Sequence, residues 1–149
     1  LGDDTMAIIL SDHGTQLLDH GRFGKGPDEL HPFNTQLNLM MKVPDAPHNV
    51  DVNALVQNHD LMPTLLGRLG VPCDWTDGRD VWPVVSGDRA AIRDHLVTGW
   101  SGFTTGNATG RASVRDGRWN FCTAVGYEDE EGDELFDVLE DPDEINNVK

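Results

Sequence analysis

The feature that most constrains the fold is a continuous apolar run, Met-Ala-Ile-Ile-Leu at residues 6–10, which ends at the polar turn Ser11-Asp12-His13-Gly14. An apolar run of this kind, bounded by polar residues, is typical of a strand buried in a parallel or mixed sheet. We therefore expect an α/β fold. Because the chain opens just before a buried strand, we also expect the beginning of the protein to be missing. The lack of a signal peptide then says little about the compartment, for which the cytoplasm is only slightly favoured.

A second strand and a helix are expected in the middle of the chain. Residues 36–43 form an apolar stretch that ends at Pro44, which is typical of a strand. Asp60 can cap a helix, and Gly70 can supply the left-handed residue at its C-terminus. Residues 81–85 are expected to form one helical turn. The apolar face of the helix is predicted to be Leu61, Leu65, Leu66 and Leu69.

The last third of the chain has the pattern of an antiparallel sheet. Polar and apolar residues alternate over 111–115 and again over 118–122. Between them stands Asp116-Gly117, a strong signal for a two-residue hairpin turn. A third strand is expected at 134–138. These elements predict a small sheet near the C-terminus.

The charge of the chain excludes some partners. In 149 residues, acidic side chains outnumber basic ones by 26 to 11, which gives a net charge of −15. Nucleic acid is excluded because no cluster of Lys and Arg could neutralise a run of phosphates. Membrane insertion is excluded because no apolar run approaches the roughly 20 residues that span a bilayer. The acidic run at 128–133 is interpreted as a solvated loop, and metal binding by it is the less favoured alternative.

The kind of acidic residue is also informative. The chain has 19 Asp and 7 Glu against 3 Lys and 8 Arg. Because salt at molar concentration screens repulsion between exposed charges, this composition favours a halophilic protein. The alternative is an acidic surface in a protein that works at ordinary salt.

Two residues directly after the first strand are candidate metal ligands. Asp12 and His13 stand beyond the carboxyl end of the strand, where ligands bind in open α/β sheets. Both residue types bind metals, and neighbours in a turn can converge on one ion. The alternative is that Asp12 only stabilises the turn through its own backbone.

A glycine-rich loop downstream adds a candidate anion-binding group. His20 and Lys25 lie in this loop, which contains Gly21, Gly24 and Gly26. A lysine ammonium held between glycines can donate three hydrogen bonds to a tetrahedral oxyanion. The alternatives are a solvated lysine and a loop imidazole that is satisfied by backbone groups.

Five segments in chain order carry a family resemblance: 11–14 with 19–21 and 24–25, 59–66 with Gly70, 77–80 with Pro83, 114–119, and 134–137 with 141–147. Together they resemble the C-terminal half of a type I sulfatase, a member of the alkaline-phosphatase-like superfamily. The resemblance implies a mixed α/β sheet with a small antiparallel C-terminal sheet. By this match, residues 1–99 belong to the catalytic α/β domain and residues 100–149 to a C-terminal subdomain.

The resemblance also implies a function and a set of site residues. It implies an enzyme that hydrolyses sulfate esters, with Asp12 and His13 as metal ligands. Lys25 would be a catalytic residue that binds the sulfate, and His20 would have a secondary role at the leaving-group oxygen. The metal of this family is usually Ca²⁺, which prefers oxygen ligands. The imidazole of His13 leaves room for Mn²⁺ or Zn²⁺, or for a role beside the metal.

The chain departs from the family at the nucleophile. Sulfatases use a formylglycine made from Cys or Ser in a Cys/Ser-x-Pro/Ala-x-Arg motif, and neither Cys73 nor Cys122 has that context. Both are interpreted as buried thiols, and the nucleophile is expected upstream, in a missing N-terminal half of the same enzyme. Two alternatives remain. One is a phosphodiesterase or phosphonate monoester hydrolase of the same superfamily, and the other is a non-catalytic binding domain on the same scaffold.

Overall fold

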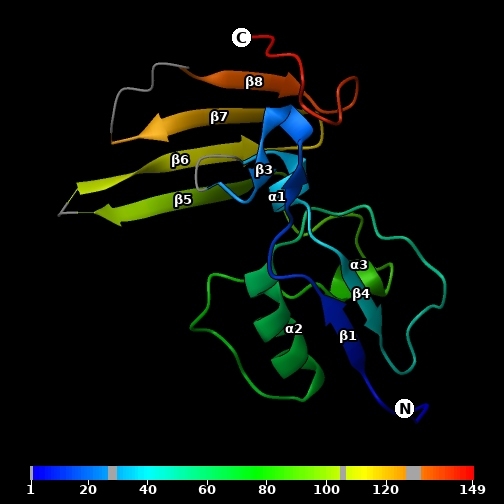
Figure 1. Ribbon diagram of the computed structural model, residues 1–149. Coiled ribbons are helices and arrows are strands. Elements are labelled where there is room, and N and C mark those ends of the chain that lie inside the picture. Colours follow the sequence, from blue (N-terminus) through cyan, green and yellow to red (C-terminus); the bar gives the residue numbers. More distant parts are fainter. Residues whose placement is uncertain (1, 27–29, 105–106, 127–131) are drawn as a thin grey trace. The chain divides into compact units, whose positions relative to one another are not determined.

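The computed structural model describes residues 2–26, 30–104, 107–126 and 132–149 (Figure 1). Contacts between residues divide the chain into two compact units. The first combines Leu1–Ile9 with Met40–Leu96, and the second combines Leu10–Leu39 with Val97–Lys149. These units are defined by contacts within this chain. They do not test the predicted boundary at residue 99 between the α/β domain and the C-terminal subdomain, which stays a prediction.

The first unit is built from a short sheet and helical segments. β1, Ala7–Leu10, pairs with β4, Leu39–Lys42, in a two-stranded sheet. The 3-10 helix η2, Asn58–Asp60, leads directly into α2, Leu61–Arg68, and α3 follows at Trp82–Val85. The expected strands, helix and helical turn are thus confirmed, although the second strand is shorter than its apolar stretch.

The burial of β1 differs from the expectation. Ile9 is 64% exposed and Leu10 is 39% exposed, so the strand is not buried on both faces. Within the described residues β1 has β4 as its single partner strand. A two-stranded sheet leaves apolar side chains uncovered unless other elements pack on it. The prediction of a strand is therefore confirmed, and the prediction that it is buried is wrong for this chain.

The leucine face predicted for helix α2 is only partly covered: Leu61, Leu65 and Leu66 are half-buried, whereas Pro63 and Thr64 are buried. The Asp60 side chain makes no capping hydrogen bond to α2. Leu69 lies beyond the helix end and is 76% exposed, so it is not part of a buried face. Thr64 is buried, and its hydroxyl is fully hydrogen-bonded: it donates to the Asp60 carbonyl and accepts from the Val81 amide. Gly70 has a φ of +70°, the left-handed conformation that was expected there.

The second unit contains a four-stranded antiparallel sheet (Figure 1). Its strands lie in chain order: β5, Leu96–Thr104; β6, Asn107–Arg115; β7, Trp119–Val125; and β8, Glu134–Asp137. In the β6–β7 hairpin Val114 pairs with Phe121 and Arg115 with Asn120, so the hairpin and its two strands are confirmed. The turn is longer than the two residues Asp116-Gly117 that were predicted, because β7 begins at Trp119 and the Asp116 amide donates to the Trp119 carbonyl at 2.9 Å. The expected third strand is β8. The sequence analysis missed β5, which begins in a stretch interpreted as loop.

A second, smaller hairpin precedes this sheet in the same unit. β2, Gln16–Leu17, pairs antiparallel with β3, Phe23–Gly24, and the 3-10 turn η1, Asp19–Gly21, joins them. A short helix, α1, follows at Pro32–Thr35. The glycine-rich loop of the sequence is therefore a hairpin. Its second strand ends at Gly24, so the hairpin determines the backbone position of Lys25.

The remaining expectations concern surface and thiols. The structure gives no description of residues 127–131, so most of the acidic run at 128–133 lies outside the described residues. In the parts that are described, no helix has the length and apolar character needed to cross a membrane. Cys122 is buried as expected, and burial raises the pKa of its thiol to about 12. Cys73 is half-buried, so that part of the prediction is wrong.

Candidate functional site

The structure brings Asp12, His13 and Lys25 together. Asp12 and His13 follow the end of β1, and Lys25 follows β3. The Lys25 ammonium donates a hydrogen bond to His13 Nε2 at 2.7 Å. The same nitrogen lies 3.6 Å from Asp12 Oδ2. Three side chains that were selected from the sequence thus meet at one imidazole nitrogen.

The partners of His13 define its protonation. Its Nδ1 lies 2.7 Å from the Gly14 carbonyl oxygen, which can only accept a hydrogen bond. Nδ1 therefore carries the proton, and Nε2 offers its lone pair to the Lys25 ammonium, which can only donate. This assignment rests on the partners and gives a neutral imidazole. The Nε2 lone pair is also the one through which His13 would bind a cation.

Asp12 is an exposed carboxylate with one oxygen directed at His13. Its side chain is 88% exposed. Oδ1 accepts a hydrogen bond from the His13 amide at 2.9 Å, which is the turn-stabilising role that the sequence had left open. This hydrogen bond, followed by the proximity of the His13 ring, lowers the pKa of Asp12 below its usual value. Asp12 is therefore negatively charged at neutral pH.

Asp12 Oδ2 and His13 Nε2 fit part of a cation site. At their separation of 3.6 Å, a single ion can contact both atoms at bond lengths of about 2.0–2.6 Å. A carboxylate and a neutral imidazole are suitable ligands for Mn²⁺ and Zn²⁺, and the carboxylate for Ca²⁺. In the described portion of the chain, no group of three or more His, Cys, Asp and Glu side chains could hold a metal. Further ligands would have to come from elsewhere.

A glycine fixes the turn that carries these residues. The Gly14 amide donates to the Asn34 carbonyl at 3.0 Å. A Cβ atom on Gly14 would lie 1.9 Å from the Phe33 carbonyl oxygen, a distance that no real side chain tolerates. The turn therefore lies directly against the backbone of α1, and His13 is held by backbone packing although its own side chain is exposed.

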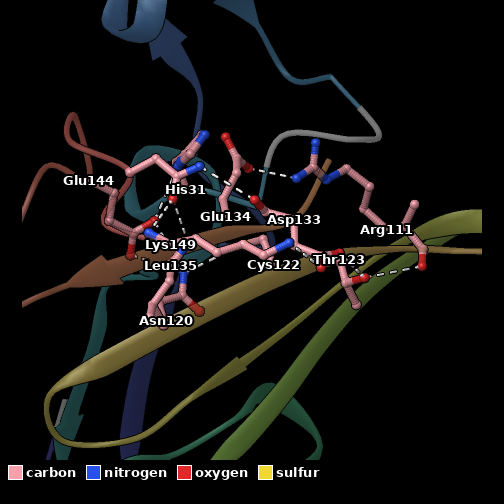
Figure 2. Close-up of polar contacts among 12 residues, drawn as sticks. His31, Arg111, Asn120, Cys122, Thr123, Asp133, Glu134, Leu135, Glu144 and Lys149 are labelled. Carbon is pink, nitrogen blue, oxygen red and sulfur yellow. Dashed lines mark hydrogen bonds and ion pairs between the residues drawn. The ribbon is translucent and has the colours of Figure 1, made fainter. Parts of the chain in front are cut away.

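His20 is not joined to the other three residues by its hydrogen bond. Its Nε2–H donates to the Asp143 carbonyl at 2.8 Å, and its ring stacks on His31 with centroids 3.9 Å apart. His31 Nδ1–H donates to Glu144 Oε2 at 3.1 Å (Figure 2). The sequence analysis missed His31 and Glu144 as partners because 113 residues separate them along the chain.

A second polar cluster lies in the other unit, around Asp60. This carboxylate is fully buried and accepts from both terminal nitrogens of Arg93, from the Arg79 amide at 2.8 Å and from the Gln57 amide at 2.7 Å. Burial alone would raise the pKa of Asp60, but the hydrogen bonds from Arg93 and the two amides outweigh it, and the pKa is lowered. With every oxygen occupied by donors of the protein, Asp60 is a structural carboxylate.

Comparison with known proteins places these observations in a family. A family model described as N-sulphoglucosamine sulphohydrolase, C-terminal, matches residues 19–149. Arylsulfatase K of Rattus norvegicus is 28% identical over 154 residues, covering 97% of this chain and 26% of that protein. An extracellular sulfatase SULF-1 homolog of Drosophila melanogaster is 34% identical over 96 residues, covering 62% of this chain and 8% of that protein. The chain thus spans about a quarter of the first relative and less of the second.

Solved structures share the fold. A 2-O GAG sulfatase superposes with a TM-score of 0.81 at 22% identity, covering 96% of this chain and 31% of that one. A phosphonate monoester hydrolase from Silicibacter pomeroyi superposes with a TM-score of 0.76 at 23% identity, covering 92% of this chain and 29% of that one. The predicted fold class, α/β of the alkaline-phosphatase-like kind with a small antiparallel C-terminal sheet, is confirmed by these neighbours.

Proposed function

Because the chain belongs to the N-sulphoglucosamine sulphohydrolase C-terminal family, as its resemblance to the C-terminal part of a sulfatase predicted, we propose that it is part of an enzyme that hydrolyses sulfate esters. Its relatives include proteins named arylsulfatase and choline-sulfatase. The observation that supports the proposal best is the meeting of Asp12, His13 and Lys25 at His13 Nε2. A non-catalytic domain would have no need of such an arrangement.

Each of the three side chains receives a role. Asp12 Oδ2 and His13 Nε2 would hold a divalent cation, and Lys25 would bind a sulfate oxygen. When bound, the cation would supply a positive charge that stabilises the sulfuryl oxygens in the transition state. The exposed Lys25 ammonium would leave His13 and donate its hydrogen bonds to the sulfate, which frees the Nε2 lone pair for the metal. We propose Ca²⁺ first because Asp12 supplies oxygen, with Mn²⁺ or Zn²⁺ if His13 binds directly.

His20 keeps a secondary role in the proposal. Its Nε2–H is already donated to the Asp143 carbonyl, so Nδ1 would have to carry a second ring proton to donate to a leaving-group oxygen. The nucleophile, a formylglycine, would lie upstream of this chain. Cys122 is unsuited to that role because it is buried and is followed by Thr-Ala-Val-Gly, which lacks the Arg of the formylglycine motif. The remaining partner would be the N-terminal half of the same enzyme, which we propose completes an α/β domain that includes residues 1–99, beside a C-terminal subdomain at 100–149.

The alternative substrate is a phosphonate monoester or a phosphodiester. A phosphonate monoester hydrolase is among the structural neighbours, and these esters carry the same single negative charge as a sulfate ester. The charge of Lys25 alone does not distinguish them. Both ester types therefore belong in the first assay.

The test uses the complete enzyme with a chromogenic aryl sulfate and a matching aryl phosphonate monoester. We expect faster hydrolysis of the sulfate, and a loss of roughly 100-fold in kcat/KM in Lys25→Ala. Lys42→Ala is the matched control, because Lys42 is also exposed and donates only to the Gly2 carbonyl in the described residues. Preference for the phosphonate would favour the alternative substrate, and equal rates in Lys25→Ala and Lys42→Ala would refute the role of Lys25.

We also propose that the protein is adapted to high salt. The net charge of −15 must be screened for the compact state to persist. Thermal unfolding in low and in molar KCl tests this, and we expect a higher midpoint at high salt. An unchanged midpoint would favour an acidic protein of ordinary salt tolerance.

A further inference from the structure

We propose that Glu144 is a positioning residue for the loop that carries Lys25, although it lies near the opposite end of the chain. Its buried carboxylate fixes His31, the ring of His31 supports His20, and His20 lies in the turn of the β2–β3 hairpin. The link between tail and loop stands on the structure alone. Its catalytic consequence rests on the proposed function, since it acts through Lys25.

The surroundings of Glu144 are those of a fixed carboxylate. Its side chain is fully buried in the second unit. Oε1 accepts from Asn120 Nδ2 at 3.0 Å, and Oε2 accepts from His31 Nδ1 at 3.1 Å (Figure 2). Arg115 Nη1 also donates to Oε1, at 3.3 Å. A buried carboxylate without such donors is strongly destabilising, because its lost hydration is not replaced. All three partners donate hydrogen bonds, so both side-chain oxygens of residue 144 have to be acceptors, as they are in a carboxylate.

The hairpin turn needs support because its backbone is strained. Leu18 has a φ of +80° and His20 a φ of +50°, and neither is a glycine. A left-handed conformation at a residue with a side chain is sterically unfavourable and needs support from its surroundings. Inside the turn, the Leu18 amide donates to the Arg22 carbonyl at 2.8 Å, and the Arg22 amide to the Asp19 carbonyl at 3.0 Å. The Gly21 amide also donates to the Leu18 carbonyl at 3.1 Å, and the Leu17 amide to Asp19 Oδ2 at 2.7 Å. None of these bonds involves the His20 side chain, whose contacts come from outside the turn.

The tail of the chain supplies that support from two directions. The Asp143 carbonyl accepts from His20 Nε2, and the neighbouring residue, Glu144, orients the His31 ring on which His20 stacks, with planes only 13° apart. His20 is thus held both at its edge and on its face. Lys25 stands five residues later, just after the strand paired with β2 through Gln16 and Gly24. Loss of the tail contacts would let the turn relax and move the ammonium away from His13.

The first test measures the loop itself, without any substrate. In the complete enzyme, amide hydrogen exchange is compared for peptides that cover residues 16–24 and, as an internal reference without a contact to Glu144, helix α2 at Leu61–Arg68. In Glu144→Gln an amide NH₂ faces donors, so we expect roughly tenfold faster exchange in the loop and little change in the reference. The matched control is Glu134→Gln, which removes the charge from another ion pair of the same sheet, with Arg111 at 2.6 Å.

A second variant, His20→Phe, tests the same link in case Glu144→Gln does not fold. His20→Phe keeps a ring that can stack on His31 but loses the hydrogen bond to Asp143, and it leaves the buried carboxylate unchanged. Faster loop exchange in both Glu144→Gln and His20→Phe, with Glu134→Gln like the wild type, supports the proposal. Unchanged loop exchange in both variants, or an equal gain in Glu134→Gln, overturns it.

A kinetic cycle separates positioning from general destabilisation. If Glu144 acts through Lys25, Glu144→Gln should lower kcat/KM by about tenfold in the wild type and by less than about twofold in the Lys25→Ala background. Equal losses in both backgrounds would refute the positioning role. A wild-type enzyme that hydrolyses neither ester would refute the proposed function, and the exchange measurements would still decide whether the tail holds the loop.

Discussion

Asp12 and Asp60 make an instructive comparison, because each stands beside a histidine in the sequence and each has a lowered pKa. The side chain of Asp12 is 88% exposed, and its Oδ2 lies 3.6 Å from His13 Nε2. Asp60 is fully buried, 3.8 Å from His59, and surrounded by donors from Arg93 and two backbone amides. An adjacent Asp and His therefore do not identify a metal site.

The difference lies in what remains for a ligand. The oxygens of Asp60 are occupied by the protein, which satisfies a buried charge and joins three segments of the first unit. The Asp12 carboxylate lies at an exposed turn whose backbone is fixed by the packing of Gly14 against Phe33. An exposed carboxylate on a fixed backbone, such as Asp12, is available to bind a ligand. A buried carboxylate whose oxygens all accept hydrogen bonds from the protein, such as Asp60, stabilises the fold.

The largest effect on stability is expected at Asp60. Arg93→Ala leaves a buried carboxylate without its ion pair and should lower the free energy of unfolding by about 3–5 kcal/mol. The control is Arg118→Ala, which removes the partner of Asp137 from a pair whose arginine is 56% exposed, and should leave the unfolding midpoint nearly unchanged because solvent screens the pair. Urea unfolding midpoints measure both. Similar losses in the two variants would remove the distinction between buried and exposed carboxylates.

The next effect concerns the turn beneath Asp12 and His13. Gly14→Ala would place a Cβ 1.9 Å from the Phe33 carbonyl, so the backbone must shift, at a cost of about 1–3 kcal/mol. Gly117→Ala is the matched control, since nothing lies within 4 Å of its Cβ position. The unfolding midpoint of each variant is the measurement. A Gly14→Ala protein as stable as Gly117→Ala would mean that this turn is not held by the packing described.

These effects also show which parts of the molecule could be predicted from sequence. Local signals were sufficient for β1, α2 and the β6–β7 hairpin, because apolar runs, helix-terminal residues and Asp116-Gly117 act within a few residues. They failed for β2 and β3, which have two residues each and no periodicity. They also failed for β5, Leu96–Thr104, whose start falls in a loop-like stretch.

The candidate site was predictable to a similar degree. Asp12, His13 and Lys25 were selected by their position after a strand, by a glycine-rich loop and by the family resemblance, and the structure brings them together. The partner of His20 was not predictable, because it is a backbone carbonyl 123 residues away. In the sequence, Glu144 is one more acidic residue of an acidic tail. It is buried because it contacts Asn120 and His31, which are 24 and 113 residues away along the chain.

A smaller effect is expected from pH. The pKa of Asp60 is lowered in the folded protein relative to the unfolded value of about 3.9. Its contribution to stability is therefore fully present above that value and is lost as the pH falls through the lower folded pKa. Below about pH 4, the unfolding midpoint of the wild type should therefore fall more steeply than that of Asp60→Asn. Parallel curves would show that Asp60 does not contribute through its charge.

The most direct test of the account compares Asp12→Asn with Asp60→Asn in the complete enzyme, with metal content and unfolding midpoint measured on the same samples. We predict that Asp12→Asn loses bound metal and keeps the unfolding midpoint of the wild type, since the exposed Asn side chain retains the oxygen that accepts from the His13 amide. Asp60→Asn should lose stability and, once folded, retain its metal. If Asp12→Asn keeps full metal content, or if the two variants lose metal and stability alike, then Asp12 is not a metal ligand and the proposed site is wrong.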